Sequence, residues 1–411
     1  MRTWLLAMLA TVGCGDNLVA PPDAPPHVFV DAAPSFGARM PQAIVGDPTA
    51  IMTAPKGMAI TWDNDPNQVD LEKFFGAYGA SPAWAEQTAE YGVGTLTNAP
   101  PQHIAGNAPA TVLESTLLGL LTTNTAGANP PWGPPDENTI YMFFIPKGTK
   151  FDDGSGSFAC QGYDGYHFDT MINGVDVAYS ISAVCHQEAL GLGITDLQDV
   201  TITAGHEAVE TATDPRTSTS APIGWGDVDD AHAVWGYITE GELGDLCEYA
   251  ATEAWESPPS LDYSVQRTWS NAAAAAGHDP CVGDGTTPYY QTIPDQLDTA
   301  TINYTGTPRP THGTKIAKGA TGTIDLEVYA DAPGAGPFTV TLVDDSEAFG
   351  GTALLQFTQP TGTYMPGDKL HVPVKVLGLD SSLDGGEAFE VDTTPVSGGG
   401  PATAYYGLVV Q

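Results

Sequence analysis

Long apolar runs mark a first region of the chain in which a sheet should form. Residues 57–62 alternate like an opening strand, residues 139–146 form a continuous apolar run ending in a proline, and residues 175–184 form a second such run. A continuous run indicates a strand buried on both faces, which is typical of a sheet covered by helices. The fold class predicted for residues 51–304 is therefore α/β or α+β, with a zincin-like arrangement as one form of it.

Segments with helical spacing lie between these strands. Residues 70–91 carry an apolar stripe, and the pair Ser81-Pro82 predicts that a second helix begins within them. Residues 112–121 and 196–213 are predicted to be further helices.

The pattern changes near residue 305. Short alternating segments, separated by Gly, Pro and Asp, recur to the end of the chain at residues 323–329, 338–342, 370–376 and 404–410. This spacing predicts that residues 305–411 form an all-β sandwich of immunoglobulin-like type. The segment shows no catalytic cluster, so we expect a spacer or adhesion role for it.

The N-terminus predicts export. Arg2 precedes an apolar run that is too short to span a bilayer, and the run ends at Gly13-Cys14, which resembles a bacterial lipobox. Residues 1–14 are therefore predicted to be a signal peptide with a lipobox and Cys14 the lipidated residue, with ordinary signal cleavage as the alternative. Residues 15–50, rich in Pro, Ala and Asp, are predicted to be a flexible tether.

These features predict a location outside the cytoplasm. No later segment has the length and hydrophobicity of a membrane span. We expect an exported protein that is either anchored to the outer membrane or cell surface or is extracellular, with membrane contact through the lipid anchor only.

The charge of the chain is strongly acidic. Its 411 residues include 50 Asp and Glu against 13 Lys and Arg, for a formal net charge of -37. Such a surface repels phosphate backbones, so nucleic acid is not an expected partner. It favours cations, although a solvated acidic surface explains most of the charge without any specific site.

Four cysteines remain once Cys14 is set aside, and an even number in an exported chain indicates disulfides. They allow about three pairings, and the sequence alone does not choose among them. We expect Cys160–Cys185 and Cys247–Cys281, because each pair encloses one compact segment. A zinc site of four thiolates is the rival, but the chain has no C-x-x-C spacing.

The helix at residues 196–213 carries the strongest chemical motif. His206 and Glu210 lie four residues apart and hence on one helix face, where an imidazole nitrogen and a carboxylate oxygen can bind one cation. Glu207 would lie beside that cation as the general base. This is the logic of H-E-x-x-H metalloproteases, with Glu210 in place of the second histidine. A His and carboxylate set suits zinc, and the carboxylates also suit calcium.

Further metal ligands can come from the residues that follow. Asp214 precedes a proline that should end the helix, so it can turn inward as a ligand or fix the turn, and both interpretations stay open. Glu242 and Asp245 lie on a loop that Cys247 would fix by a disulfide. His167 can face the same pocket, although such a histidine is more often structural.

The ordered landmarks of residues 55–285 resemble the bacterial relatives of the EXORDIUM, or phosphate-induced protein 1, family. They comprise Trp62, residues 90–94, 141–146, 165–167, 179–185, 213–215, 242–247 and 265–271, and the cysteines Cys160 and Cys281. The resemblance implies secretion and a cell-surface or wall location, and it implies no settled biochemical activity. A looser likeness to zincin metallopeptidases covers residues 200–214.

Three functions are compatible with these features. The first is a metal-dependent hydrolase, a metallopeptidase by its motif, which acts on peptides. The second is a non-catalytic surface protein whose carboxylates bind structural calcium. The third is a module that binds carbohydrate or cell-wall polysaccharide through Trp225, Trp235 and Tyr237 as exposed loop aromatics.

Overall fold

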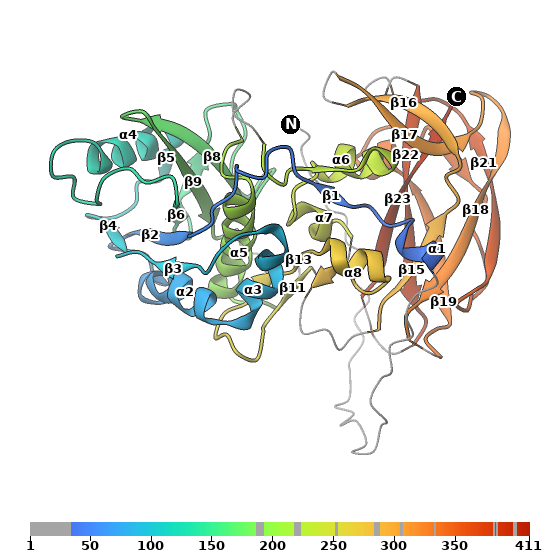
Figure 1. Ribbon diagram of the computed structural model, residues 1–411. Helices are drawn as coiled ribbons and strands as arrows, with labels where there is room; N and C mark the ends of the chain where they lie inside the picture. Colours follow the sequence, from blue (N-terminus) through green and yellow to red (C-terminus); the bar gives the residue numbers. More distant parts are fainter. Residues whose placement is uncertain are drawn as a thin grey trace, which may run out of the picture.

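The computed structural model describes most of the chain from residue 34 onward. The described residues are 34–185, 193–217, 223–250, 254–282, 288–304, 307–332, 334–380, 383, 385–397 and 401–411. Cys14, the predicted signal peptide and the first part of the predicted tether lie outside them. The described chain forms an α/β unit and a β-sandwich side by side, with α6, α7 and α8 between them (Figure 1).

A six-stranded sheet forms the centre of the α/β unit. Its order is β3-β2-β6-β9-β8, with β4 also paired to β2. Strands β3, β4 and β6 pair with β2 in parallel, β9 pairs with β6 in parallel, and β8 is antiparallel to β9. The strands are β2 (Lys56–Trp62), β3 (Thr97–Asn98), β4 (Gln102–Ile104), β6 (Thr139–Ile145), β8 (Gly165–Ile172) and β9 (Val175–Ala183).

Helices cover both faces of this sheet, which explains the continuous apolar run of β6. Ile140, Met142 and Phe144 of β6 face a core shared with α2 (Gln68–Ala80), α3 (Pro82–Thr88) and α5 (Asp196–Thr213). The alternate residues Tyr141, Phe143 and Ile145 face a second core with α4 (Glu114–Thr125). Each side chain of β6 is therefore removed from water.

The helix predicted at residues 112–121 begins later than expected. Thr111–Leu113 is a short strand, β5, which pairs in parallel with β7 (Lys150–Asp152), and α4 begins at Glu114. Val112 is buried while its two neighbours are exposed, so the period-two pattern of a strand holds over these residues.

The sandwich consists of two sheets. One has the order β15-β18-β21-β20, and the other has the order β16-β17-β23-β22-β19, in which β17 and β23 are parallel. The strands are β15 (Tyr290–Pro294), β16 (Asp298–Tyr304), β17 (Thr307–Lys315), β18 (Thr321–Ala330), β19 (Phe338–Asp344), β20 (Leu355–Phe357), β21 (Lys369–Val376), β22 (Gly386–Pro395) and β23 (Thr403–Val410).

The sandwich starts at Tyr290 rather than at residue 305. β15 pairs with β18 and β16 pairs with β17, so both strands belong to the sandwich sheets. The hydrophobic pattern of β15 is weak in the sequence because this strand buries polar side chains. Gln291 and Thr292 are buried, and the Thr292 hydroxyl accepts a hydrogen bond from Thr393 at 2.8 Å.

The segment predicted as a tether is folded from residue 34 onward. It forms α1 (Pro34–Gly37) and β1 (Ala43–Ile44), which pairs with β10 (Asp227–Val228). Phe36 stacks on Tyr329 with a centroid distance of 3.4 Å, and Arg39 binds Asp295 at 2.8 Å. These contacts hold residues 34–44 against both the α/β unit and the sandwich.

Short elements connect the two parts and support the loops after α5. Trp235 of α6 (Ala233–Thr239) is buried and packs edge-on against Tyr405 and Tyr406 of β23. The Trp225 ring packs against Tyr91. These tryptophans are thus packed in the fold, in contrast to the exposed aromatics expected of a carbohydrate platform.

The remaining short elements are η1 (Ala89–Tyr91), η3 (Asp230–His232), α7 (Asp245–Glu248), β11 (Trp255–Glu256), β12 (Val265–Gln266), β13 (Thr268–Trp269), α8 (Asn271–Ala276), β14 (Cys281–Val282) and α9 (Asp345–Ala348).

The disulfides are Cys160–Cys185 and Cys247–Cys281, the pairing expected from the sequence. Two disulfides indicate that the chain folds in an oxidising compartment outside the cytoplasm. Among the residues described, no helix combines the length and hydrophobicity that crossing a membrane would require.

Candidate metal centre

Helix α5 positions the centre, and its ends are well defined. Thr195 and Gln198 form a capping box at its start. Asp196 and Asp199 lie in the first turn, where negative charge interacts favourably with the helix dipole. At the other end, the Asp214 carboxylate accepts a hydrogen bond from the Gly224 amide at 2.8 Å. The second half of α5 is buried, so its polar side chains need partners inside the protein.

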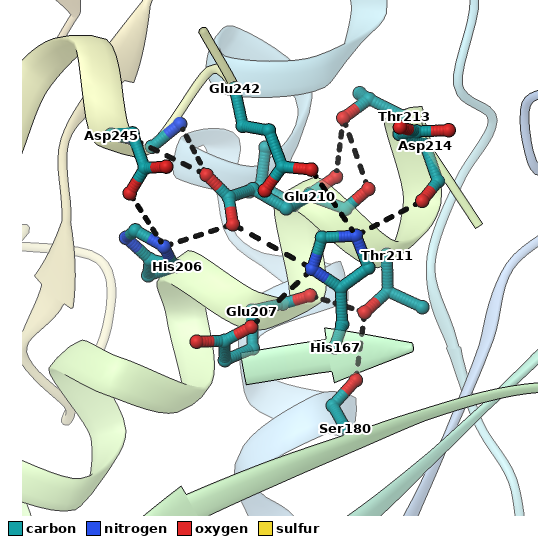
Figure 2. A network of polar contacts seen from close by, with 12 residues as sticks. His167, Ser180, His206, Glu207, Glu210, Thr211, Thr213, Asp214, Glu242 and Asp245 are labelled. Carbon is teal, nitrogen blue, oxygen red and sulfur yellow. Dashed lines mark hydrogen bonds and ion pairs between the residues drawn. The ribbon is translucent and has the colours of Figure 1, made fainter. Parts of the chain in front are cut away.

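His206 and Glu210 point toward each other on one face of α5, as their spacing predicts (Figure 2). His206 Nε2 lies 2.9 Å from Glu210 Oε2 and 3.6 Å from Asp245 Oδ1. Ligands of a tetrahedral zinc ion are separated by about 3.4 Å, so these distances suit a shared cation. Glu207 belongs to the same buried group, since one donor atom each of His206, Glu207 and Glu210 lie within 4.8 Å of one another.

The turn before α7 brings Glu242 and Asp245 to this face of α5. The amides of Gly244 and Asp245 donate to Glu210 Oε1 at 3.0 and 3.2 Å. Gln266 donates to the Gly244 carbonyl at 2.7 Å, and the disulfide of Cys247 follows directly. The turn is therefore fixed on both sides, as a loop that carries metal ligands should be.

His167 enters the centre from β8. It pairs across the sheet with Ser180, whose hydroxyl bonds Thr211 of α5, so both side chains face α5. His167 Nδ1 lies 3.5 Å from Glu207 Oε2 and 3.7 Å from Glu210 Oε2, and its Nε2 lies 3.8 Å from Glu242 Oε1. The sequence raises His167 only as a side chain that can face this pocket, because the strand register that brings it here is not visible in a motif.

Two outcomes differ from the predicted ligand set. The Asp214 carboxylate is used by the Gly224 amide, and none of the three donor groups found among the described residues includes Asp214. Glu248 joins the centre instead, with Oε2 3.9 Å from His206 Nδ1. Glu248 lies three residues after Asp245 on α7, and that helical spacing is the signal by which the sequence can find it.

The electrostatics of the centre show an excess of negative charge. Burial by itself would lower the pKa of His206, but Glu210, Glu207 and Asp245 outweigh it and hold the pKa well above its usual range. In the same way, burial opposes the carboxylates of Glu242, Glu207 and Glu210, which raise the pKa of His167 to about 10.

Two carboxylates of the centre, Glu210 and Asp245, have pKa values shifted in the direction that favours their neutral form. Burial raises the pKa of Glu210 to about 7, against the lowering effect of His206. Burial, with Glu210 next, holds the pKa of Asp245 well above its usual range. Glu210 and Asp245 therefore hold a proton more tightly than exposed carboxylates do, beside two histidines whose pKa values are also raised.

Comparisons with known proteins add little to this geometry. No family model and no curated protein matches the chain. Among solved structures, the chain has a likeness to domains 4 and 5 of the S-layer protein SbsC, at 12% identity over 28% of this chain and 46% of that chain, with a TM-score of 0.16. The chain thus matches less than half the length of that structure. A second likeness is to a conjugative transposon lipoprotein from Bacteroides eggerthii, at 12% identity over 29% of this chain and 95% of that chain, with a TM-score of 0.16.

Proposed function

We propose that the protein is an exported metal-dependent hydrolase of the metallopeptidase type, with zinc at His206 and Glu210. The observation that carries this proposal is the arrangement on α5: His206 Nε2 and Glu210 Oε2 converge at 2.9 Å, and Glu207 is buried beside them. Asp245 completes the set from the opposite turn, 3.6 Å from His206 Nε2. One imidazole and two carboxylates are an acceptable zinc ligand set.

Glu207 is the general base in this proposal. It accepts a proton from a water molecule, whose oxygen forms a bond to the carbonyl carbon of a peptide bond. The C–N bond then breaks, and the departing amine takes the proton from Glu207, so that one water is consumed and a carboxylate and an amine result. A bound zinc ion would polarise the carbonyl and make the water a better nucleophile. Glu207 is buried, and its Oε2 makes no hydrogen bond within the described chain, with His167 Nδ1 3.5 Å away.

Several finer predictions belong to the same proposal. Membership of the EXORDIUM family, a zincin-like form of the α/β unit and an immunoglobulin-like type of sandwich all stay predictions. Cys14 is proposed as the lipid anchor at the cell surface, where the substrates would be peptides or wall material. The two disulfides support the extracytoplasmic location.

The test compares the wild-type protein with Glu207→Gln on fluorescently labelled casein, after removal of metal by a chelator and again after zinc is added back. We expect zinc to restore hydrolysis to the wild type only, while Glu207→Gln binds zinc with the wild-type stoichiometry. Glu86→Gln is the matched control, because Glu86 is an exposed glutamate on α3. Hydrolysis by Glu207→Gln at the wild-type rate would remove Glu207 from the mechanism.

A second candidate function is a non-catalytic surface protein in which the same centre holds a structural cation such as calcium. It is favoured by the many carboxylates and by the two hydrogen bonds that the backbone amides of Gly244 and Asp245 donate to Glu210. Under this alternative, calcium would raise the melting temperature and no hydrolysis would follow the addition of either metal.

A further inference from the structure

We propose that the centre binds two divalent cations, with the Glu210 carboxylate between them. This inference rests on the proposed function, because the first cation is the one at His206, Glu210 and Asp245. The second position is defined by His167, Glu210 and Glu242, whose donor atoms lie within 4.8 Å of one another. Figure 2 shows Glu210 between the two imidazoles, with Asp245 beside His206 and Glu242 beside His167.

Glu210 has one oxygen free to face both positions. Its Oε1 accepts hydrogen bonds from the backbone amides of Gly244 and Asp245, and these fix the orientation of the carboxylate. Its Oε2 lies 2.9 Å from His206 Nε2 and 3.7 Å from His167 Nδ1. A single carboxylate oxygen between two imidazoles can bridge two cations, each of which has its own histidine.

His167 is oriented as a metal ligand should be. Its Nε2 lies 3.0 Å from the carbonyl oxygen of Asp214, which can accept the Nε2 proton. A histidine that donates one ring nitrogen to a backbone carbonyl offers the lone pair of the other nitrogen to a metal. Here that nitrogen is Nδ1, the atom that faces Glu207 and Glu210.

The environment of Glu207 is an independent observation that favours a cation at the second position. Its side chain is 4% exposed, and its Oε2 lies 3.5 Å from His167 Nδ1. This oxygen is buried and has no hydrogen bond to any residue that the structure describes. A buried carboxylate oxygen without a hydrogen bond is costly, and water held by a cation at His167 would satisfy it.

Charge also favours two cations over one. Five carboxylates surround the two imidazoles, from Glu207, Glu210, Glu242, Asp245 and Glu248. One divalent cation leaves most of this charge uncompensated, whereas two nearly balance it. The turn at residues 242–245 brings one carboxylate to each imidazole: Glu242 belongs to the donor group of His167 and Glu210, with its Oε1 3.8 Å from His167 Nε2, and Asp245 Oδ1 lies 3.6 Å from His206 Nε2. Two-metal hydrolases hold their ions about 3.5–4 Å apart, often around shared ligands.

The experiment counts bound zinc on the full chain. Metal-free protein is equilibrated with zinc, free zinc is removed, and the zinc-to-protein ratio is measured by mass spectrometry and by isothermal titration. We expect two zinc ions per wild-type chain and one per chain for Glu242→Gln and for His167→Ala. Glu240→Gln is the matched control on the same loop and should retain two, because Glu240 belongs to none of the donor groups.

Each outcome has a distinct meaning. One zinc ion per wild-type chain would overturn the second position and leave the proposed function standing, whereas none would overturn both. Two ions in the wild type and in Glu242→Gln would show that the second ion lies elsewhere, which also contradicts the proposal. Glu242→Gln keeps the size of a partly exposed side chain, so it tests the second position even if His167→Ala, which removes a buried ring, fails to fold.

Discussion

Gly244 marks the closest approach between the turn and α5. A Cβ atom at this position would lie 2.7 Å from His206 Nδ1 and 2.8 Å from Glu210 Oε1. The backbone of Gly244 is right-handed helical, with φ -71° and ψ -46°, so alanine is compatible with its conformation. The glycine is needed because of the space that the two ligands occupy.

We predict that Gly244→Ala weakens zinc binding by about 10- to 100-fold, because it displaces His206 and Glu210 and removes the amide contacts that orient them. Gly119→Ala is the control, since an added Cβ there meets nothing within 4 Å on α4. Competition with a zinc-binding dye measures the affinity. Equal affinity for Gly244→Ala and wild type would contradict the proposed role of this turn.

At this scale the sequence predicts the part of the centre that lies on one helix. His206 and Glu210 are four residues apart, and helix geometry alone brings them together. His167 reaches the same place through the register of β8 against β9, and no spacing in the sequence reports that register. The sequence leaves Asp214 open between ligand and turn, and in the structure its Oδ1 accepts a hydrogen bond from the Gly224 amide.

Among the elements, β22 carries a buried carboxylate that the proposed chemistry does not use. Glu387 is fully buried, and its Oε1 accepts a 2.8 Å hydrogen bond from the Ser346 hydroxyl of α9. Burial raises the pKa of Glu387 to about 8, well above the ordinary value of 4.5. The folded protein therefore binds this proton more tightly than the unfolded chain does.

The sign of the pH dependence follows from that shift. The contribution of Glu387 to stability is fully present below about pH 4.5 and is lost as the pH rises through about 8. We predict that Glu387→Gln stabilises the protein relative to wild type more near pH 9 than near pH 5, as urea unfolding would measure. The exposed Glu347→Gln on α9 is the control. A difference between variant and wild type that does not change with pH would contradict the assignment.

Elements whose side chains follow a clear period are predicted well, and those with polar interiors are not. The limits of β6 agree with the prediction within a residue because its burial matches its apolar run, and those of α5 agree because a proline follows its end and a capping box begins it. The sequence prediction misses β15, whose interior is polar, and β8, which is only partly buried. The predicted helix at residues 112–121 overlaps β5, because Val112 fits the spacing of apolar residues in a helix as well as in a strand.

On the scale of the whole molecule, the sandwich and the α/β unit are joined by α6. Trp235 packs against Trp269 on one side and against Tyr405 and Tyr406 of β23 on the other. Arg309 of β17 adds an ion pair with Asp230 at 3.0 Å. The sandwich thus packs against α6, the helix that precedes the turn at Gly244.

We predict that Trp235→Ala lowers the free energy of unfolding by about 3 to 5 kcal/mol, because it leaves a large cavity at this junction. In calorimetry we expect one transition for the wild type and two for Trp235→Ala, one for each part of the molecule. Trp255→Ala removes a partly exposed tryptophan and should have a much smaller effect. A loss below about 1 kcal/mol with one retained transition would show that Trp235 does not couple the two parts.

The central claim is that His206 and Glu210 converge on a cation. Crystals grown with zinc and measured on both sides of the zinc absorption edge test it directly. We predict an anomalous difference peak within bonding distance of His206 Nε2 and Glu210 Oε2, about 2.0–2.2 Å from each. An absence of any peak there, with the two side chains in direct hydrogen-bond contact in zinc-soaked crystals, would contradict the metal centre and the hydrolase function built on it.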